Sequence, residues 1–249
     1  MNAFHTAELA KLRHLTPEDE IRDTYFSNRF DTAYAPVISV DTGKILGFQT
    51  SERIWAYRYR RPSDGRFPTN RHHPLLSLQD KLELKRQQIL HAPDQGWLML
   101  DLDPGSFFAA DGAPRNAFLQ LFERYAWSER EIIVNLIGRH KGSGLQAMAD
   151  RLQQAGVEIA LDAAGLHRGL FSLGAFLDAT IVKFDRSALG AEPRATVIPT
   201  EALLNVARDI GVQTVMAGVD QREHYDWARS MGVDAVQGRL FRSGGMRNQ

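Results

Sequence analysis

The feature that most constrains the fold is a regular alternation of strand-like and helix-like segments from residue 97 to residue 238. Short apolar runs rich in β-branched residues alternate with segments of helical periodicity. Alternation of this length is typical of a parallel sheet, and its extent suits closure into a barrel. The expected strands are 97–102, 131–137, 157–162, 179–185, 213–219 and 235–238, and the expected helices are 117–125, 144–155, 170–177, 201–210 and 222–231.

The segments before this alternation follow a different pattern. Strand-like runs at 34–40 and 44–50 are joined by the short turn Asp41-Thr42-Gly43, which predicts a hairpin and therefore an antiparallel first strand. Leucines interleaved with charged residues predict an amphipathic helix over 75–90. Residues 1–30 are typical of a helical lead-in, with a helix start at Thr16-Pro17. Two roles stay open for this lead-in: packing across the bottom of a barrel, or binding a partner or a second copy.

Together these segments predict one α/β domain. We expect a single (β/α)8 TIM-type barrel over residues 31–245, with an antiparallel first strand, preceded by an N-terminal helical extension over residues 1–30. The chain has 249 residues, and β/α barrels typically have about 250 residues in one domain.

Composition excludes several classes of function. Thirty basic and thirty acidic residues give zero formal net charge, so binding to duplex nucleic acid is not expected. The chain has no cysteine, which removes disulfides, thiolate chemistry and zinc–cysteine sites and fits a reducing compartment. No run of about 18 apolar residues is present, so membrane insertion is not expected. The sequence therefore predicts a cytoplasmic protein.

Polar residues cluster where the expected strands end. The clearest example is the stretch GVEIALDAAGLHRG, in which a buried run ends in the single carboxylate of Asp162. Such a residue either faces a ligand at a barrel mouth or caps the next helix, and the recurrence of the pattern favours the mouth. The other polar residues at strand ends are Gln49, Asp101, Asn135, Lys183 with Asp185, and Gln237.

A basic, aromatic-rich stretch follows the second expected strand and predicts a long loop. A solvated loop is the default interpretation, but arginines beside aromatics also suit the phosphates and purines of a cyclic dinucleotide or an acidic protein surface. The adjacent His72 and His73 are interpreted as a solvated pair, because neighbouring histidines do not readily chelate one ion. The basic residues are Arg58, Arg60, Arg61, Arg66 and Arg71, interleaved with Tyr57, Tyr59 and Phe67.

Several ordered segments resemble the EAL domains, phosphodiesterases of the bacterial second messenger cyclic di-GMP. The opening YAPVISVDTGKILGFQTSER is similar to the hairpin that ends in Glu-Ala-Leu and an arginine, here matched by Arg53. LMLDLDP resembles the third-strand segment, GVEIALDAAG the strand ending in Asp-Asp-Phe-Gly, and ATIVKFDRS the segment bearing Lys-Ile-Asp. MAGVD and GVDAVQGRLF correspond to the Glu-Gly-Val-Glu and Gln-Gly segments.

The resemblance also implies how this chain departs from active members of the family. Those members hold divalent cations, usually magnesium or manganese, with a glutamate, an asparagine, a second glutamate and an aspartate. Only the aspartate is unchanged here, and two further family carboxylates are replaced by Ala163 and Ala217. The resemblance therefore implies weak or absent metal binding at Asp101 and Asp162 and does not support a two-metal site. The four ligand positions fall on Gln49, Asp101, Asn135 and Asp162.

We therefore predict a catalytically inactive, degenerate EAL-domain regulator in cyclic di-GMP-linked signalling. It is expected to act by protein contact, by weak metal-independent cyclic di-GMP binding, or by both, and a homodimer is compatible with the sequence. No cofactor and no catalytic residue are expected, and magnesium or manganese enter only with residual activity. The vestigial site comprises Gln49, Asp101, Asn135, Asp162 and Lys183; expected ligand contacts are Arg53, Asp162, Lys183, Asp185 and Gln237; expected partner contacts are Arg58, Arg60, Arg61 and Arg66. The alternative is a residual metal-dependent phosphodiesterase in which Gln49 and Asp101 exchange roles.

Overall fold

The computed structural model of the chain describes residues 30–54, 76–112, 115–126, 131–138, 144–163, 172–185 and 200–241. The chain divides into two compact units, Tyr34–Thr50 with Leu76–Gln249, and Met1–Ala33 with Ser51–Leu75. The first unit contains most of the described residues. In the second, the described residues are 30–33 and 51–54. The N-terminal extension, the arginine-aromatic loop and His72-His73 lie outside the described residues, so the domain division near residue 30 stays a prediction.

Eight strands close into a barrel in sequence order. Strands β2 to β8 pair in parallel, whereas β1 pairs antiparallel with β8. The first strand therefore runs against the other seven, which confirms the prediction of a barrel with an antiparallel first strand. The strands are β1 (Phe30–Ser39), β2 (Ile45–Ile54), β3 (Trp97–Leu102), β4 (Ile132–Leu136), β5 (Glu158–Asp162), β6 (Ile181–Phe184), β7 (Gln213–Ala217) and β8 (Ala235–Gln237).

The turn between β1 and β2 shows why this strand reverses. Gly43 has a φ of 66°, and its N–H donates to the Ser39 carbonyl at 3.0 Å. Positive φ is readily adopted by glycine, and it lets the chain turn back within a few residues. The Ser39 N–H then donates to the Lys44 carbonyl at 2.9 Å, which begins the antiparallel pairing.

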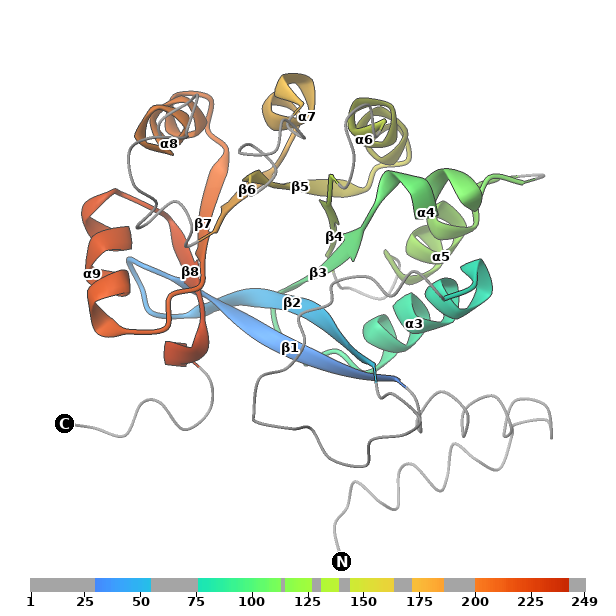
Figure 1. The fold of residues 1–249 in the computed structure, drawn as a ribbon, viewed down its shortest axis with the longest axis horizontal. Helices are drawn as coiled ribbons and strands as arrows, with labels where there is room; N and C mark the ends of the chain where they lie inside the picture. Colours follow the sequence, from blue (N-terminus) through green and yellow to red (C-terminus); the bar gives the residue numbers. More distant parts are fainter. Residues whose placement is uncertain are drawn as a thin grey trace, which may run out of the picture. The chain divides into compact units, whose positions relative to one another are not determined.

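Helices follow the parallel strands and lie outside the ring (Figure 1). All five helices expected after residue 97 match within three residues at each end, and the largest difference is at α7, which begins at residue 173. Helix α4 was not among the predicted helices, although Asp103 before Pro104 is a recognisable helix start. The Asp103 carboxylate accepts from the Ser106 N–H at 3.0 Å. The elements are α3 (Leu78–Leu90), α4 (Pro104–Ala109), α5 (Ala117–Ala126), α6 (Leu145–Gln154), α7 (Leu173–Leu177), α8 (Thr200–Asp209), α9 (Arg222–Ser230) and the 3₁₀ turn η5 (Arg239–Phe241).

Side-chain alternation along the strands builds two separate cores. In β4, Val134 and Leu136 pack outward against the helices, whereas Ile133 points into the barrel. The inner core is a small apolar group with one residue from most strands. Its members are Val37, Met99, Ile133, Ala160, Ile181, Val215 and Ala235. Two residues further along each parallel strand, the next inward-facing position lies at the carboxyl end of the barrel.

Helix α3 differs from its predicted amphipathic pattern in what it buries. Lys85 is 3% exposed and Glu83 is 9% exposed, although charged residues were expected on a solvated face. The Lys85 ammonium donates to Gln88 Oε1 at 3.0 Å, and Arg86 pairs with Glu83 at 2.6 Å. Buried charges are retained when they are paired in this way. In α3, the presence of charged residues therefore does not show which face of the helix is exposed to solvent.

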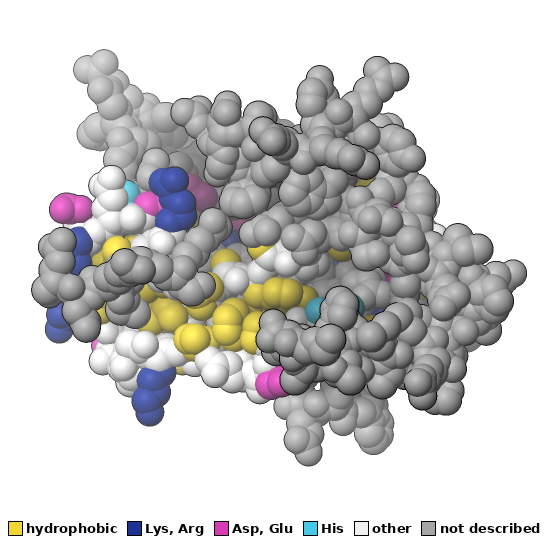
Figure 2. Space-filling model, turned by 90° about the horizontal axis from the view of Figure 1, so that it is seen from below, with side chains coloured by type: hydrophobic (Ala, Val, Ile, Leu, Met, Phe, Trp, Pro, Cys, Tyr) yellow, Lys and Arg dark blue, Asp and Glu magenta, His cyan; other side chains and the backbone are white. Residues whose placement is uncertain are grey.

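Figure 2 views the molecule from below relative to Figure 1, and hydrophobic side chains gather in a band on this face. Strands β1 and β2 lie toward this side of the ring (Figure 1). Because a hairpin joins them, their connection supplies no helix. Tyr34 and Phe48 are partly buried against the outer core. Among the described residues, no helix is long and apolar enough to cross a membrane.

Candidate functional site at the carboxyl ends of the strands

The polar residues predicted at strand ends come together inside one end of the barrel. The strand register pairs Asp101 with Asn135 and Asp162 with Lys183. Partners in parallel strands point to the same side of the sheet, and these positions follow the inner core by two residues. The inward ring at the carboxyl ends is Gln49, Asp101, Asn135, Asp162, Lys183, Ala217 and Gln237.

Four of these side chains form a continuous hydrogen-bonded chain, which we name the mouth relay: Lys183, Gln49, Asp101 and Asn135. The Lys183 ammonium donates to Gln49 Oε1 at 2.5 Å. Gln49 Nε2 then donates to Asp101 Oδ1 at 2.7 Å. Asn135 Nδ2 donates to the same Asp101 oxygen at 2.8 Å. The relay thus runs from a cation, through an amide, to a carboxylate that two amides share.

The side chains of the mouth relay are largely buried, and their hydrogen bonds fix the orientation of both amides. Asn135 is 0% exposed, Lys183 4% and Gln49 7%, and Asp101 is half-buried. An ammonium can only donate and a carboxylate can only accept, so the Gln49 amide has one orientation that satisfies both neighbours. The Asn135 amide is oriented by the same carboxylate. Hydrogen bonds between charged and polar groups are stronger in such a water-poor setting than in solvent.

One atom of the relay is left over. Asn135 Oδ1 is buried and accepts no hydrogen bond from any described residue. Most buried polar side-chain atoms in proteins have a partner, so an open acceptor calls for a specific explanation. The orientation of the amide gives that explanation here, because turning it would place the oxygen against the Asp101 carboxylate.

The remaining predicted residues take several positions. Gln237 Nε2 donates to the Ala35 carbonyl of β1 at 3.3 Å. Asp162 and Asp185 are half-buried, near the ends of β5 and β6. The backbone of Arg53 is part of β2, but its side chain lies outside the described residues, as do Arg58, Arg60, Arg61 and Arg66. Their roles stay predictions.

Two alanines occupy positions where the family pattern has carboxylates: Ala217 belongs to the inward ring, whereas Ala163 packs in the outer core. Ala163 is 3% exposed and Ala217 is 6% exposed. Each is buried where the family pattern has a carboxylate, and a methyl group offers neither charge nor a lone pair. The two alanines can be read directly from the sequence. The contact between Lys183 and Gln49, which lie 134 residues apart, was not predicted. Their strand positions and the two-residue alternation indicated only that both would face inward.

Close to the mouth, Asp220 follows β7 and pairs with Arg239 of η5. The Asp220 carboxylate accepts from the Arg239 backbone N–H at 2.9 Å and from its guanidinium at 2.7 Å. This hydrogen bond raises the pKa of the Arg239 guanidinium above its ordinary value. The pair joins the ends of β7 and β8 and leaves Arg239 largely exposed.

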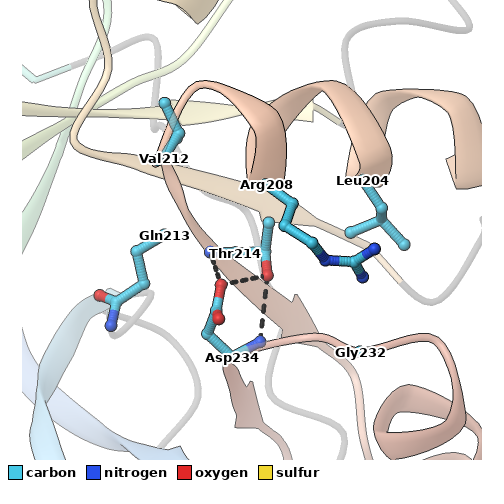
Figure 3. Close-up of a pocket in the computed structure, with 8 residues that line it drawn as sticks. Leu204, Arg208, Val212, Gln213, Thr214, Gly232 and Asp234 are labelled. Atoms are coloured by element: carbon cyan, nitrogen blue, oxygen red, sulfur yellow. Dashed lines mark hydrogen bonds between the residues drawn. The ribbon is translucent and has the colours of Figure 1, made fainter.

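A second polar cluster lies at the opposite, amino-terminal ends of β7 and β8 (Figure 3). The Asp234 carboxylate accepts from the Thr214 N–H at 2.7 Å and from the Thr214 hydroxyl at 2.6 Å. The Asp234 N–H donates back to the Thr214 hydroxyl oxygen at 3.0 Å. We name this pair the Asp234 staple. It borders an open pocket lined by Leu204, Arg208, Gly211, Val212, Gln213, Thr214, Gly232 and Asp234.

The pocket beside the Asp234 staple is a structural feature of the amino-terminal end of the barrel. The staple ties the start of β7 to the residue before β8, and each of its bonds involves Thr214 and Asp234 alone. Arg208 donates to the Met231 carbonyl at 3.2 Å and extends beside Gly232 (Figure 3). In β/α barrels, residues at this end usually serve stability, whereas sites lie at the carboxyl ends.

The chain matches known proteins in both sequence and fold. The EAL domain family model matches residues 18–243. The chain is 25% identical over 243 aligned positions to the "Probable cyclic di-GMP phosphodiesterase PdeN" of Escherichia coli (strain K12). That alignment covers 90% of this chain and 45% of PdeN, so the chain spans less than half of that relative.

Solved structures share the fold at lower sequence identity. The phosphodiesterase PaMucR in complex with c-di-GMP superposes with a TM-score of 0.66 at 16% identity, covering 90% of this chain and 94% of that one. The YkuI protein of Bacillus subtilis, in complex with substrate c-di-GMP and calcium, gives a TM-score of 0.62 at 17% identity, covering 92% and 57%. With the family model matching most of its length, the chain belongs to the EAL domain family.

Proposed function

We propose that this EAL domain is catalytically inactive and acts as a regulator in cyclic di-GMP-linked signalling. The observation that carries the proposal is the mouth relay, in which the carboxylate of Asp101 is engaged by two amides and the amide of Gln49 by the ammonium of Lys183. Cyclic di-GMP is the expected nucleotide because related EAL proteins are named for it or bound to it. The output is protein contact, metal-independent nucleotide binding, or both.

The first support is the mismatch between these residues and a pair of divalent cations. Hard cations prefer several anionic oxygen ligands. At the family's ligand positions this chain has amides at Gln49 and Asn135, and methyl groups at Ala163 and Ala217. The amide hydrogens of Gln49 and Asn135 point at Asp101, so a cation there would meet donors in place of acceptors. The described residues contain no group of three or more histidine, cysteine or acidic side chains arranged to hold a metal.

The second support comes from the chemistry of phosphodiester hydrolysis. A nucleophilic hydroxide at neutral pH usually comes from water bound to one or two metal ions. Without a fitting metal site, the chain needs another base to generate it. Lys183 cannot serve in the observed state because its ammonium is already a donor to Gln49. Binding through hydrogen bonds and charge does not need the metals.

Two surfaces are candidates for the regulatory contact. The mouth presents Lys183, Asp162 and Gln237, with Arg53 expected nearby from the sequence. The arginine-aromatic loop is the other candidate, and its arginines suit an acidic protein surface. We favour protein contact as the main output because Thr50, Ser51 and Glu52 alter the segment that precedes Arg53.

A second candidate function is residual phosphodiesterase activity. It is favoured by one contact: the Asp101 carboxylate lies 2.7 Å from the Gln49 amide, so a carboxylate sits beside the position of the family's first glutamate. In this alternative, Asp101 replaces the missing charge and a single magnesium or manganese ion is held with Asp162.

Two measurements test the proposal. We expect no metal-dependent conversion of cyclic di-GMP to the linear dinucleotide by purified protein; turnover that disappears in Asp162→Ala would establish the residual enzyme instead. Calorimetric titration with cyclic di-GMP, with and without magnesium or manganese, tests nucleotide binding. If the mouth binds nucleotide, Arg53→Ala and Lys183→Ala each weaken it by about 1 to 3 kcal/mol.

The same titration separates the two surfaces. If the loop is the functional surface, nucleotide binding is absent, and replacing Arg58, Arg60, Arg61 and Arg66 abolishes a protein complex instead. Micromolar or tighter cyclic di-GMP binding that survives those replacements would contradict protein contact as the main output.

A further inference from the structure

We propose that the mouth binds a guanidinium group, supplied by an arginine side chain of a protein partner that enters the carboxyl end of the barrel. The inference rests on the proposed function and deepens it, because it names the chemistry of the partner at the same site. Two acceptors carry it, to which the described residues offer no donor: Asp101 Oδ2 and Asn135 Oδ1.

The Asp101 carboxylate has an unused oxygen. The two hydrogen bonds that it receives, from Gln49 at 2.7 Å and from Asn135 at 2.8 Å, both end on Oδ1. No described residue donates to Oδ2. A carboxylate offers about four acceptor positions, so roughly half of its capacity is open. Because Asp101 is only half-buried, a ligand that enters at the carboxyl ends of the strands can reach it.

The Asn135 amide holds the second open acceptor. This side chain is 0% exposed, and its Oδ1 receives no hydrogen bond from the described residues. A buried acceptor without a donor carries a desolvation cost, which an N–H group of a ligand removes. The amide cannot relieve that cost by turning over, because its oxygen would then face the Asp101 carboxylate. Asn135 is therefore oriented to receive a donor.

The balance of charge at the mouth favours a donor that is also a cation. In the inward ring, the carboxylates of Asp101 and Asp162 outnumber the single ammonium of Lys183. Asp162 contributes here only through its charge. Lys183 repels a second cation, but the Gln49 amide lies between its ammonium and Asp101, whereas a bound cation would contact Asp101 directly. Charge interactions weaken with distance, so the attraction exceeds the repulsion.

A guanidinium group fits these acceptors better than other cations. It only donates, through five N–H groups in a planar fork, and it is more weakly hydrated than an ammonium. The two open oxygens belong to side chains that are hydrogen-bonded to each other at 2.8 Å, so one fork can approach both. A calcium ion takes about six to eight oxygen ligands, whereas a guanidinium group can be held by two acceptors.

The test is a titration of the full chain with propylguanidinium, which reproduces the end of an arginine side chain, followed by proton–nitrogen NMR. We expect saturable binding that shifts the side-chain amide signals of Gln49 and Asn135, because both amides contact Asp101. Tetramethylammonium has the same charge but no N–H group, so it should bind at least about tenfold more weakly.

Three variants locate the binding. Asp101→Asn removes the carboxylate and should weaken binding at least about tenfold, whereas Asn135→Leu removes the buried acceptor and should weaken it about threefold to tenfold. Asp226→Asn is the matched control, because it makes the same change of charge at an exposed side chain of α9 and should leave the affinity unchanged. If Asp101→Asn does not fold, Asn135→Leu decides the result through the Gln49 amide signal.

A second titration identifies the source of the guanidinium group. A blocked Gly-Arg-Gly peptide should bind at least as tightly as propylguanidinium, and a Gly-Lys-Gly peptide should bind more weakly because an ammonium has no planar fork. An arginine peptide that binds at least about tenfold more weakly than propylguanidinium would support a free guanidino compound and overturn the protein source.

Two results would overturn the inference as a whole. One is the absence of any shift in the Gln49 and Asn135 amide signals at millimolar propylguanidinium; the other is a folded Asp101→Asn variant that binds as tightly as wild type. Metal-dependent hydrolysis of cyclic di-GMP by wild type would instead overturn the proposed function, so the two failures are distinguishable.

Discussion

The two ends of the barrel hold polar clusters of opposite design. In the Asp234 staple, a carboxylate accepts from the N–H and hydroxyl of Thr214, and the hydroxyl oxygen accepts a backbone N–H in return. In the mouth relay, side chains bond to side chains, and the buried Asn135 Oδ1 has no partner among the described residues. The staple supplies hydrogen-bond partners to backbone N–H groups, whereas the relay's hydrogen bonds join side chains to one another.

This difference indicates what each cluster contributes. A buried donor that loses its partner costs about 1 to 3 kcal/mol, so the staple should contribute to stability. The relay contains a buried lysine and an open acceptor, which gives it a smaller expected net benefit to folding. Its composition fits the role that we propose for the mouth better than a role in stability. The following predictions test this contrast, from the largest expected effect to the smallest.

The largest effect is expected from restoring the family's ligands at the mouth. If lost carboxylates and the relay account for inactivity, the restored variant should hydrolyse cyclic di-GMP with manganese at least about a hundredfold faster than wild type, because a metal-activated water supplies several kcal/mol. Product analysis by chromatography measures the rate. The substitutions are Gln49→Glu, Asp101→Asn, Asn135→Glu, Ala163→Asp and Ala217→Glu.

The control for this variant is the same set with Asp162→Ala, which should abolish the activity. A well-folded restored variant with no activity would show that the mouth differs from active family members in more than these side chains.

Removing the staple should affect stability and leave the mouth unchanged. Asp234→Ala leaves the N–H and hydroxyl of Thr214 without their acceptor, and Thr214 is 3% exposed. We expect the free energy of unfolding to fall by about 2 kcal/mol, measured by urea denaturation. Asp226→Ala, which removes an exposed partner of Arg222, should change it by less than about 0.5 kcal/mol. Equal effects for both variants would contradict a stabilising role for the staple.

A matched pair of apolar substitutions should separate the two clusters by the size of the stability loss. Thr214→Val removes the hydroxyl that links β7 to Asp234 and should cost about 1 kcal/mol of unfolding free energy. Asn135→Leu removes an amide with one open acceptor and should be nearly neutral, within about 1 kcal/mol, because Asp101 keeps the Gln49 amide. Both are read from the same denaturation curves. A larger loss for Asn135→Leu than for Thr214→Val would break the contrast.

The smallest effect concerns an exposed pair that serves as a reference for both clusters. Arg151 donates to Asp111 at 2.8 Å and, with Asn116, lowers the pKa of the Asp111 carboxyl below its ordinary value of 3.8. A lowered folded-state pKa contributes stability above pH 3.8, and this contribution is lost as the pH falls through the folded-state value.

Asp111→Asn should therefore be slightly less stable than wild type at neutral pH, and the difference should vanish in acid. Thermal unfolding of both proteins across this pH range measures it. A difference that grows as the pH falls would show that the sign is wrong.

The sequence determined most of the architecture because strand and helix patterns are local. Alternation after residue 97 predicted β3 at its observed bounds, and the Asp41-Thr42-Gly43 turn predicted the reversed first strand. The missed helix α4 had its own local signal in Asp103 and Pro104. The charges of α3 were misleading because side-chain burial depends on what packs against a helix, which periodicity alone does not specify.

The sequence also determined which residues stand at the mouth, since two-residue alternation and the carboxyl ends of the strands place Asp101, Asn135 and Lys183 inward. Only the tertiary structure decided how they pair. A hydrogen bond between Lys183 and Gln49 requires the ring to close so that β6 faces β2, and no local pattern encodes a contact across 134 residues. The physical reason is that the strands specify direction, whereas barrel closure brings the tips of long side chains within bonding distance.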